Sequence, residues 1–343
     1  MAVYADTRMF AEAAEAADVV ARQTAANRSM LDAVARQLQM SPPRTVLTCA
    51  RGSSDHAATY LKHLIETRVG IVVASVSPSI SSVYHSAPDM RDMLAICLSQ
   101  SGQSPDLVAT MHAAAVGGAQ TLALVNVTSS PLGKMADTLL PLHAGAEISV
   151  AATKSFIALL SASIGLVAAW TRDPRLAAAL DTLPARLRAA WTCDWSALIE
   201  RLLDARGLYV VGRGPSLGIA QEAALKLKET CGLHAEAFSA AELRHGPMAL
   251  VASDFPVLLI GQGDQAADAN DALATDLVER GVPVLMSGRA VAGAVQLPLP
   301  DGDPIVTPIL AIQAFYRAAN ELSLRRGLDP DRPPMLKKVT ETL

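Results

Sequence analysis

The fold of this chain is indicated by one stretch, TVLTCARGSSDHAATYLKHLIE, residues 45–66. Residues 45–50 form a strand-like run, and residues 51–54 place Gly and Ser in a tight turn. Residues 55–66 contain neither Gly nor Pro, so they can continue as a helix. A strand that turns directly into a helix predicts the opening of a βαβ unit.

The strand, turn and helix pattern occurs a second time. LYVVGRGPS, residues 208–216, leads into a helical stretch that continues through Glu229. Glycine and serine recur at matching places in the two copies: Gly52 with Gly214, and Ser54 with Ser216. Further apolar runs lie at residues 93–98, 120–127, 255–260 and 282–286. Strands that alternate with helices predict an α/β fold with two domains, each a doubly wound parallel sheet flanked by helices.

A length of 343 residues suits two domains of roughly 150 residues each. Residues 9–38 are Ala-rich without Gly or Pro and predict one or two helices, which Ser41-Pro42-Pro43 ends. Residues 171–207 predict connecting helices, and the Pro-rich segment 327–343 cannot form a long helix. We therefore divide the chain into an N-terminal helical segment (1–40), a first domain (41–180), a second domain (195–330) and a C-terminal tail (331–343).

The composition excludes several classes of protein. Hydrophobic residues make up 51% of the chain and charged residues 18%, so it can bury a core and fold. A net charge of -4 without a long basic run argues against a nucleic-acid partner. The apolar stretch 158–170 is interrupted by two serines and too short to cross a membrane, so we expect a buried helix and no membrane association. Residues 1–10 carry no secretory signal, so we expect a cytoplasmic protein.

The cysteines and histidines give no metal-binding pattern. Cys49, Cys97, Cys193 and Cys231 are scattered and form no C-x-x-C pair, and no histidines stand at metal-ligand spacing. We expect buried thiols in a reducing compartment, with no metal site and no cofactor.

The first motif that indicates chemistry is LSQSGQSPD, residues 98–106, between a predicted strand and a predicted helix. Its hydroxyls and amide would surround a helix N-terminus, where free N–H groups and the helix dipole favour an anion such as a sugar phosphate. The alternative is that Ser104 or a neighbouring serine caps the helix, with Pro105 in its first turn. No Walker loop occurs, and Leu217 replaces the last glycine of a G-x-G-x-x-G pattern, so a nucleotide site is disfavoured.

The second motif is QEAALKLKE, residues 221–229. Glu222, Lys226 and Glu229 stand at i, i+4 and i+7, so they share one helix face. They could form an exposed row of salt bridges, or they could place a carboxylate beside a lysine to move a proton next to a carbonyl. Downstream, His245-Gly246-Pro247 predicts an accessible histidine on a turn, which is either catalytic or a structural or surface residue.

Together these residues resemble the isomerase half of glutamine–fructose-6-phosphate amidotransferase and the related stand-alone proteins built from sugar isomerase (SIS) domains. The resemblance covers nearly the whole chain. It is carried by residues 50–56, 99–106, 147–156, 220–250 and 336–340. The block EAALKLKE with HAE and ELRHGP, at residues 222–229, 234–236 and 242–247, is highly specific.

The resemblance implies roles for particular residues. Glu229 would shuttle a proton between C1 and C2, His245 would assist ring opening, and Lys337 in the tail would meet the open-chain carbonyl. Glu222 and Lys226 would support the sugar hydroxyls and charge. The 6-phosphate would be held by Ser54, Ser99, Gln100, Ser101 and Ser104, and further substrate contacts would come from Gly52, Ser53, Val150 and Ala152. In that family the counterpart of His245 reaches the neighbouring subunit's site, which implies a homodimer.

The chain also departs from the amidotransferase pattern. It starts Met1-Ala2-Val3 and places its first strand near residue 45, so we expect no glutaminase domain and no release of ammonia from glutamine. Residues 50–56 and 103–106 look more like the stand-alone amino-sugar-6-phosphate deaminases. Ala152 replaces a serine of the synthase pattern, which puts one contact with a substrate hydroxyl in question.

We therefore expect an enzyme that converts glucosamine 6-phosphate and water to fructose 6-phosphate and ammonia. The motifs leave open a fructosamine-6-phosphate deglycase, a galactosamine-6-phosphate deaminase and a glutaminase-less fructose-6-phosphate aminotransferase, because they concern only the shared phosphate and proton-transfer centre. A non-catalytic sugar-phosphate sensor is the alternative from a different class. The sequence does not indicate which amino-sugar phosphate is preferred or which direction the reaction takes.

Overall fold

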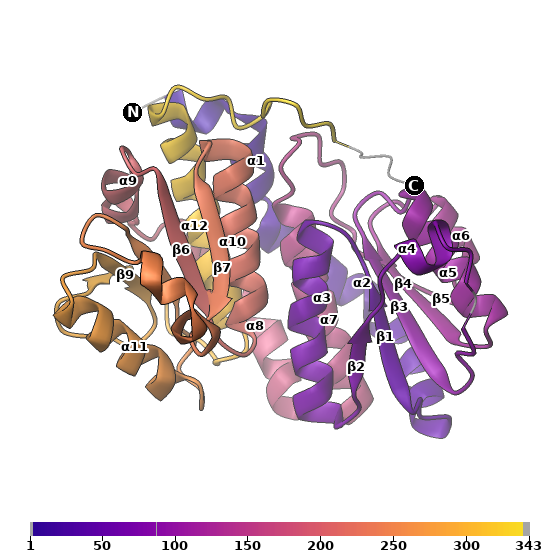
Figure 1. The fold of residues 1–343 in the computed structure, drawn as a ribbon. Coiled ribbons are helices and arrows are strands. Elements are labelled where there is room, and N and C mark those ends of the chain that lie inside the picture. The colour runs from indigo at the N-terminus through magenta and orange to yellow at the C-terminus, as the bar shows by residue number, and fades with distance from the viewer. Residues whose placement is uncertain (1–2, 87, 339–343) are drawn as a thin grey trace. The chain divides into compact units, whose positions relative to one another are not determined.

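The structure is a computed structural model that describes residues 3–86 and 88–338. The chain divides into two compact units (Figure 1). The first unit comprises Asp18–Glu147, Lys154–Asp181 and the tail from Lys337, and the second comprises the chain up to Ala17, Ile148–Thr153 and Thr182–Leu336. The domain limits expected from the sequence stay a prediction.

The first unit is built on a five-stranded parallel sheet. Its strands are β1 (Thr45–Cys49), β2 (Val73–Ser75), β3 (Met93–Ser99), β4 (Gln120–Val125) and β5 (Thr138–Pro141). They are ordered β2-β1-β3-β4-β5 in the sheet, and every described pair is parallel. The strand order therefore reverses between β1 and β3, which is the switch point of a doubly wound sheet.

Helices lie on both sides of this sheet, with α3 and α7 on one side and α5 and α6 on the other (Figure 1). The helices are α2 (Ala16–Met40), α3 (Ser53–Leu64) with its π-helical extension η2 (Ile65–Val69), α4 (Ser79–Ser82), α5 (Pro105–Val116), α6 (Pro131–Met135), α7 (Lys154–Thr171) and the start of α8 (Pro174–Trp191). Because both faces are covered, β3 is buried from Leu94 to Ser99 and β4 from Thr121 to Val125. This explains why these strands read as continuous apolar runs.

The second unit repeats the same architecture. Its strands are β6 (Gly207–Gly212), β7 (His234–Ser239), β8 (Val257–Ile260), β9 (Val284–Ser287) and β10 (Val295–Gln296), in the order β10-β9-β8-β6-β7. Its helices are η1 (Val3–Asp6), α1 (Arg8–Ala14), α9 (Ser196–Leu202), α10 (Ser216–Cys231), η3 (Glu242–His245), η4 (Pro247–Leu250), α11 (Ala267–Glu279) and α12 (Thr307–Arg325). The switch point lies between β6 and β8. The predicted fold of two doubly wound parallel sheets is confirmed.

The apolar stretch at residues 158–170 lies within α7, which is buried as predicted. In the described part of the chain, α7 is the one helix long and apolar enough to cross a membrane, yet 89% of that window is buried inside the protein. The two serines that interrupt the stretch are satisfied internally. Ser163 donates to the Leu159 carbonyl at 2.7 Å, and Ser161 donates to the Ala158 carbonyl at 3.1 Å and to Gln23. These hydrogen bonds let hydroxyls lie in an apolar core without an unpaired donor.

Candidate active site

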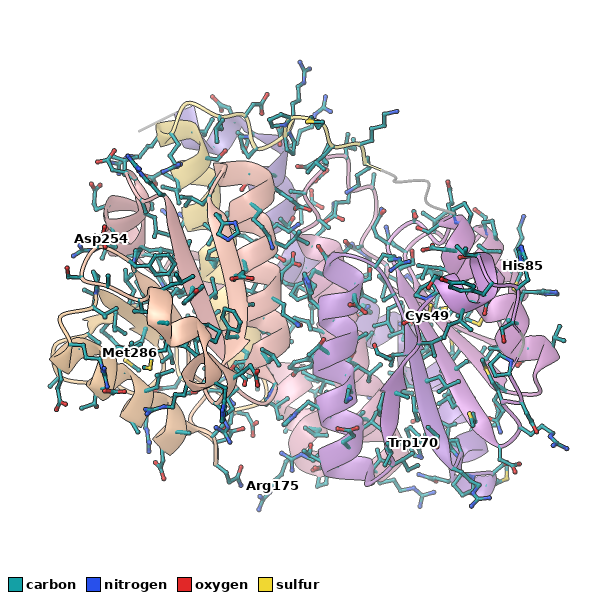
Figure 2. All side chains as sticks on the ribbon, viewed as in Figure 1. Cys49, His85, Trp170, Arg175, Asp254 and Met286 are labelled. Carbon is teal, nitrogen blue, oxygen red and sulfur yellow. The ribbon has the colours of Figure 1, made fainter. Side chains whose placement is uncertain are left out.

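The loops after β1 and β3 open at the same edge of the first unit, because the two strands are parallel neighbours with Cys49 opposite Cys97. Cys49, at the end of β1, is labelled in Figure 2. Ligands of doubly wound sheets bind at this edge, at the switch point. The β1 loop turns at Gly52, whose φ of 54° and ψ of -131° are strained for any other residue. Ser53 and Ser54 follow in the first turn of α3, so the predicted substrate contact Ser53 and the predicted phosphate ligand Ser54 both lie at the start of a helix.

The β3 loop is held in a tight turn by its own serines. Ser99 Oγ accepts the Gly102 amide at 2.9 Å, and Ser101 Oγ accepts the Gln103 amide at 3.3 Å. Gly102 has a φ of 64°, and a side chain there would stand 2.1 Å from Ser130 Oγ. Glycine is therefore required both for the backbone conformation and for the close approach of the next loop.

Ser104 occupies the N-cap position of α5, but its side chain makes no capping hydrogen bond. The Leu107 amide in the first turn is instead bound at 2.8 Å by Oδ1 of Asp106. The capping interpretation is therefore wrong for Ser104. Its half-buried hydroxyl, with that of Ser101 and the amide of Gln100, lies at the open edge of the sheet, where donors suit an anion.

The predicted face of α10 forms a buried cluster of charges in the second unit. Lys226 Nζ lies 3.5 Å from Glu222 Oε1 and also pairs with Glu229. The side chains of Glu222 and Lys226 are 0% and 1% exposed, and that of Glu229 is 20% exposed. The i, i+4, i+7 spacing did place the three on one face, but the alternative of an exposed row of salt bridges is wrong. The burial comes from packing of α10 against β6, β7 and α12.

A residue from a distant part of the chain completes this cluster. Tyr316 on α12 donates its hydroxyl to Glu222 Oε1 at 3.1 Å. A buried ion pair is stable only when its remaining polar atoms are satisfied, and Tyr316 contributes to this for Glu222. Glu229 is the member of the cluster that reaches solvent. Its ion pair with Lys226 fixes the direction of its carboxylate. A partly exposed carboxylate beside an ammonium group can take and return a proton.

His245 lies where the sequence predicted an accessible histidine. It ends the short 3-10 helix η3, and its side chain is exposed. Gly246 follows with a φ of 143°, a conformation that side chains rarely adopt. Among the described residues, His245 makes no hydrogen bond or ion pair with the charged face of α10.

Val150 and Ala152 lie in the segment between β5 and α7, and both are half-buried. In the second unit, Glu12 of α1 accepts the Ile148 amide at 2.5 Å and the Ser149 amide at 3.1 Å. Glu12 therefore sets the path of the backbone that leads to Val150. The sequence offered no signal for this role, because Glu12 and its two partners are 136 and 137 residues apart in the chain.

The tail lies against the first unit through an ion pair. Lys338 Nζ is 3.6 Å from Oε2 of Glu147, which is buried and accepts the Ser155 amide at 3.1 Å. Lys337 is exposed immediately before it. Val339 and Thr340, the end of the tail motif, lie outside the described residues. Because Glu147 holds Lys338, the predicted catalytic residue Lys337 lies directly beside a residue that is fixed to the first unit.

The structure brings the sequence-predicted residues into two sets. The first unit holds the loop residues Gly52, Ser53, Ser54, Ser99, Gln100, Ser101 and Ser104 at one sheet edge, together with Lys337 on the tail. The second unit holds Glu222, Lys226 and Glu229 on α10, with Val150, Ala152 and His245 elsewhere. Sequence reasoning missed Tyr316, which donates to Glu222, and Arg51, whose guanidinium in the β1 loop pairs with Asp106 of α5.

Neither the cysteines nor the acidic residues form a metal centre in the part of the chain that the structure describes. Cys49, Cys97 and Cys231 are buried thiols as expected, whereas Cys193 is half-buried. A hydrogen bond with Cys49 and burial raise the pKa of Cys97 well above its ordinary value, and burial raises the pKa of Cys231 to about 11. Burial together with a raised pKa makes the thiols of Cys97 and Cys231 poor nucleophiles.

Comparison with known proteins identifies related chains. Residues 39–168 and 201–286 match the family described as SIS domain. The isomerizing glutamine–fructose-6-phosphate aminotransferase of Thermococcus kodakarensis is 33% identical over 329 residues, which cover 91% of this chain and 54% of that protein. The chain thus spans about half the length of the curated relatives it matches.

Two solved structures have the same fold. A Silicibacter pomeroyi DSS-3 protein, classed as a candidate phosphosugar isomerase, has a TM-score of 0.91 and 39% identity, covering 95% of this chain and 100% of that one. Glucosamine-6-phosphate deaminase from Thermotoga maritima has a TM-score of 0.73 and 22% identity, covering 94% of this chain and 100% of that one. The second likeness shows a shared fold only.

Proposed function

This chain belongs to the SIS domain family, and on that premise we propose that it is an enzyme acting on an amino-sugar 6-phosphate. The proposed reaction converts glucosamine 6-phosphate and water to fructose 6-phosphate and ammonia. The observation that carries the proposal is the buried cluster on α10, in which Lys226 holds Glu229 while Glu229 alone reaches solvent. Burial of charges costs free energy, and a surface salt-bridge role would not need it.

The phosphate would bind at the open edge of the first unit. Hydroxyls of Ser54, Ser101 and Ser104 can donate to its oxygens, and the N-terminus of α5 adds backbone amides and a favourable dipole. Binding energy from this remote group would hold the sugar in place while the reacting carbons change.

The chemistry would proceed by proton transfers at the sugar. His245 would assist opening of the ring to the aldehyde. The Glu229 carboxylate would then take the proton from C2 and return it to C1, while a proton of the amino group passes to the C1 oxygen. C1 thereby becomes a hydroxymethyl group and C2 becomes an imine carbon. Water would add to the imine carbon and ammonia would leave, giving the ketose. Lys337 would contact the open-chain carbonyl, as the resemblance implies.

A second candidate is the reverse direction, amination of fructose 6-phosphate. It is favoured by the name of the Thermococcus relative, a glutamine–fructose-6-phosphate aminotransferase. The same proton transfer between C1 and C2 serves both directions, so the α10 cluster fits either. Deamination of galactosamine 6-phosphate differs from the main proposal only at C4, which these residues are not expected to contact. Deglycation of fructosamine 6-phosphate, whose amine is on C1, would use the same proton transfer in the direction from C1 to C2.

The test is an assay of ammonia release from glucosamine 6-phosphate, galactosamine 6-phosphate and fructosamine 6-phosphate, with fructose 6-phosphate plus ammonia run in the reverse direction. We expect the fastest release from glucosamine 6-phosphate. The Glu229→Gln variant is the control for contaminating activity. Tight phosphosugar binding without turnover of any substrate would instead indicate a sensor, and release from another sugar only would replace the substrate.

A further inference from the structure

Arg51 connects the two serine-bearing loops of the first unit. Its Nε and Nη2 lie 2.8 and 2.7 Å from Oδ2 of Asp106. Arg51 immediately precedes Gly52 in the β1 loop, whereas Asp106 lies in the first turn of α5, after the β3 loop. The ion pair therefore crosses the switch point, at the edge where the phosphate is proposed to bind.

The two partners of this ion pair differ in burial. The side chain of Asp106 is 1% exposed, and that of Arg51 is 53% exposed. Asp106 is also fixed by its bond to the Leu107 amide, so its carboxylate is the immobile end of the pair. In an ordinary surface salt bridge, both charged partners are solvated. Here a buried carboxylate holds an exposed guanidinium in one direction.

The guanidinium has donors left for a ligand. Arginine carries five N–H donors, and the contacts with Asp106 engage only Nε and Nη2. The serine hydroxyls and the amide of Gln100 on the neighbouring loops carry no net charge, whereas a phosphate monoester at neutral pH carries nearly two negative charges. The planar fork of an arginine matches phosphate oxygens well and adds the missing positive charge.

We propose that Arg51 is the charged residue that recognises the substrate phosphate, and that Asp106 is the positioning residue that aims it. The inference rests on the proposed function, since it concerns the phosphate of that substrate. The inference adds to the uncharged serine donors, because affinity for the phosphate would then depend on the positive charge of Arg51. Arg51 would thereby set the preference for phosphorylated over unphosphorylated sugars.

The experiment is calorimetric titration with fructose 6-phosphate and with inorganic phosphate, at low and high salt, of the parent, Arg51→Ala, Arg51→Lys and Asp106→Asn. Steady-state kinetics with glucosamine 6-phosphate accompany it. Arg68→Ala is the matched control, because Arg68 is an exposed arginine in η2, beyond the far end of α3. We expect Arg51→Ala to bind about 10- to 100-fold more weakly, the usual effect of losing a hydrogen bond to a charged group. Arg51→Lys should retain part of the affinity, and Arg68→Ala all of it.

The dependence on salt separates recognition from a structural role. Salt should weaken binding to the parent clearly and to Arg51→Ala much less, because the screened charge is gone. Asp106→Asn should raise KM more than it lowers kcat, since it only misdirects Arg51. Parental affinity and salt dependence in Arg51→Ala would overturn the inference and leave the proposed function standing. A parent that binds neither fructose 6-phosphate nor inorganic phosphate would instead overturn the proposed function, and this inference with it.

Discussion

The switch-point loops of the two units have the same place in the fold but different uses for their polar groups. In the second unit, Ser216 Oγ bonds with the Arg213 amide at 2.9 Å and with its carbonyl at 3.0 Å. Gln262 Nε2 donates to the same carbonyl at 2.7 Å and to Asp264 at 3.0 Å. In the first unit, Ser104 makes no capping bond, and the side chains of Ser101 and Ser104 are partly exposed.

The difference shows why one repeated architecture does not provide two equal ligand sites. Ser216 in the closed loop of the second unit donates its hydroxyl proton to its own backbone, so that proton is not available to a ligand. In the open loop of the first unit, the hydroxyls of Ser99 and Ser101 accept backbone amides and can still donate a proton. The second unit instead places its charges along α10, on the helix that follows the closed loop. The comparison therefore supports the proposal that the first unit recognises the phosphate and that α10 of the second unit carries the proton-transfer group.

The largest expected effect follows removal of the proton carrier in the second unit. Glu229→Gln keeps size and hydrogen bonding but removes the base, so kcat should fall about 10²- to 10⁴-fold with KM nearly unchanged. The free energy of unfolding should fall by only about 1–3 kcal/mol, because Lys226 keeps Glu222 as a partner. Steady-state kinetics and thermal unfolding measure both. Glu279→Gln, at the exposed end of α11, is the control, and parental kcat in Glu229→Gln would end the assignment.

A second large effect concerns how His245 is supplied. If it acts across a subunit interface, Glu229→Gln and His245→Ala should each be nearly inactive as pure proteins. Mixed dimers made by co-expression of the two variants should be far more active than the two pure variants added together. One of the two sites in such a dimer then contains both an intact Glu229 and an intact His245. Light scattering of the parent should show a dimer. A monomeric parent, or a mixture without recovery, would place His245 in its own chain's site or outside catalysis.

A smaller effect is expected in the open loop of the first unit. Ser101→Ala and Ser104→Ala each remove a donor to a charged oxygen, worth about 1.5–3 kcal/mol, so KM should rise by about 10- to 100-fold. kcat and the melting temperature should change little, because Ser104 makes no capping bond and the Gln103 amide that bonds with Ser101 is exposed to water. Kinetics with glucosamine 6-phosphate provide the measurement. Unchanged KM in both variants would move the phosphate site elsewhere.

The smallest effect on catalysis is expected in the closed loop of the second unit. Ser216→Ala leaves the Arg213 amide without its side-chain partner, so the free energy of unfolding should fall by about 1–3 kcal/mol. KM for the phosphorylated substrate should stay at the parental value. Denaturant unfolding beside kinetics tests this, and a rise in KM as large as that of Ser104→Ala would abolish the contrast between the loops.

Local patterns in the sequence predicted much of the fold and part of the site. The helices expected within residues 9–38 and 171–207 occur as α1, α2, α8 and α9, and the strands expected near residues 45, 93, 120, 208, 255 and 282 all occur. The helical period placed Glu222, Lys226 and Glu229 on one face correctly. It did not indicate burial, because a charged face looks the same in sequence whether water or a helix covers it.

By itself, then, the sequence determined what depends on neighbouring residues: the strand, turn and helix units, the serine-bearing loops at strand ends, and the shared face of α10. Only the tertiary structure decided what depends on strand order and packing. Tyr316 reaches Glu222 because α12 packs on α10, and Arg51 reaches Asp106 because β1 and β3 are neighbours although β2 lies between them in the chain. Such partners, 94 and 55 residues apart, have no common local pattern, since the folded sheet rather than the chain brings them together.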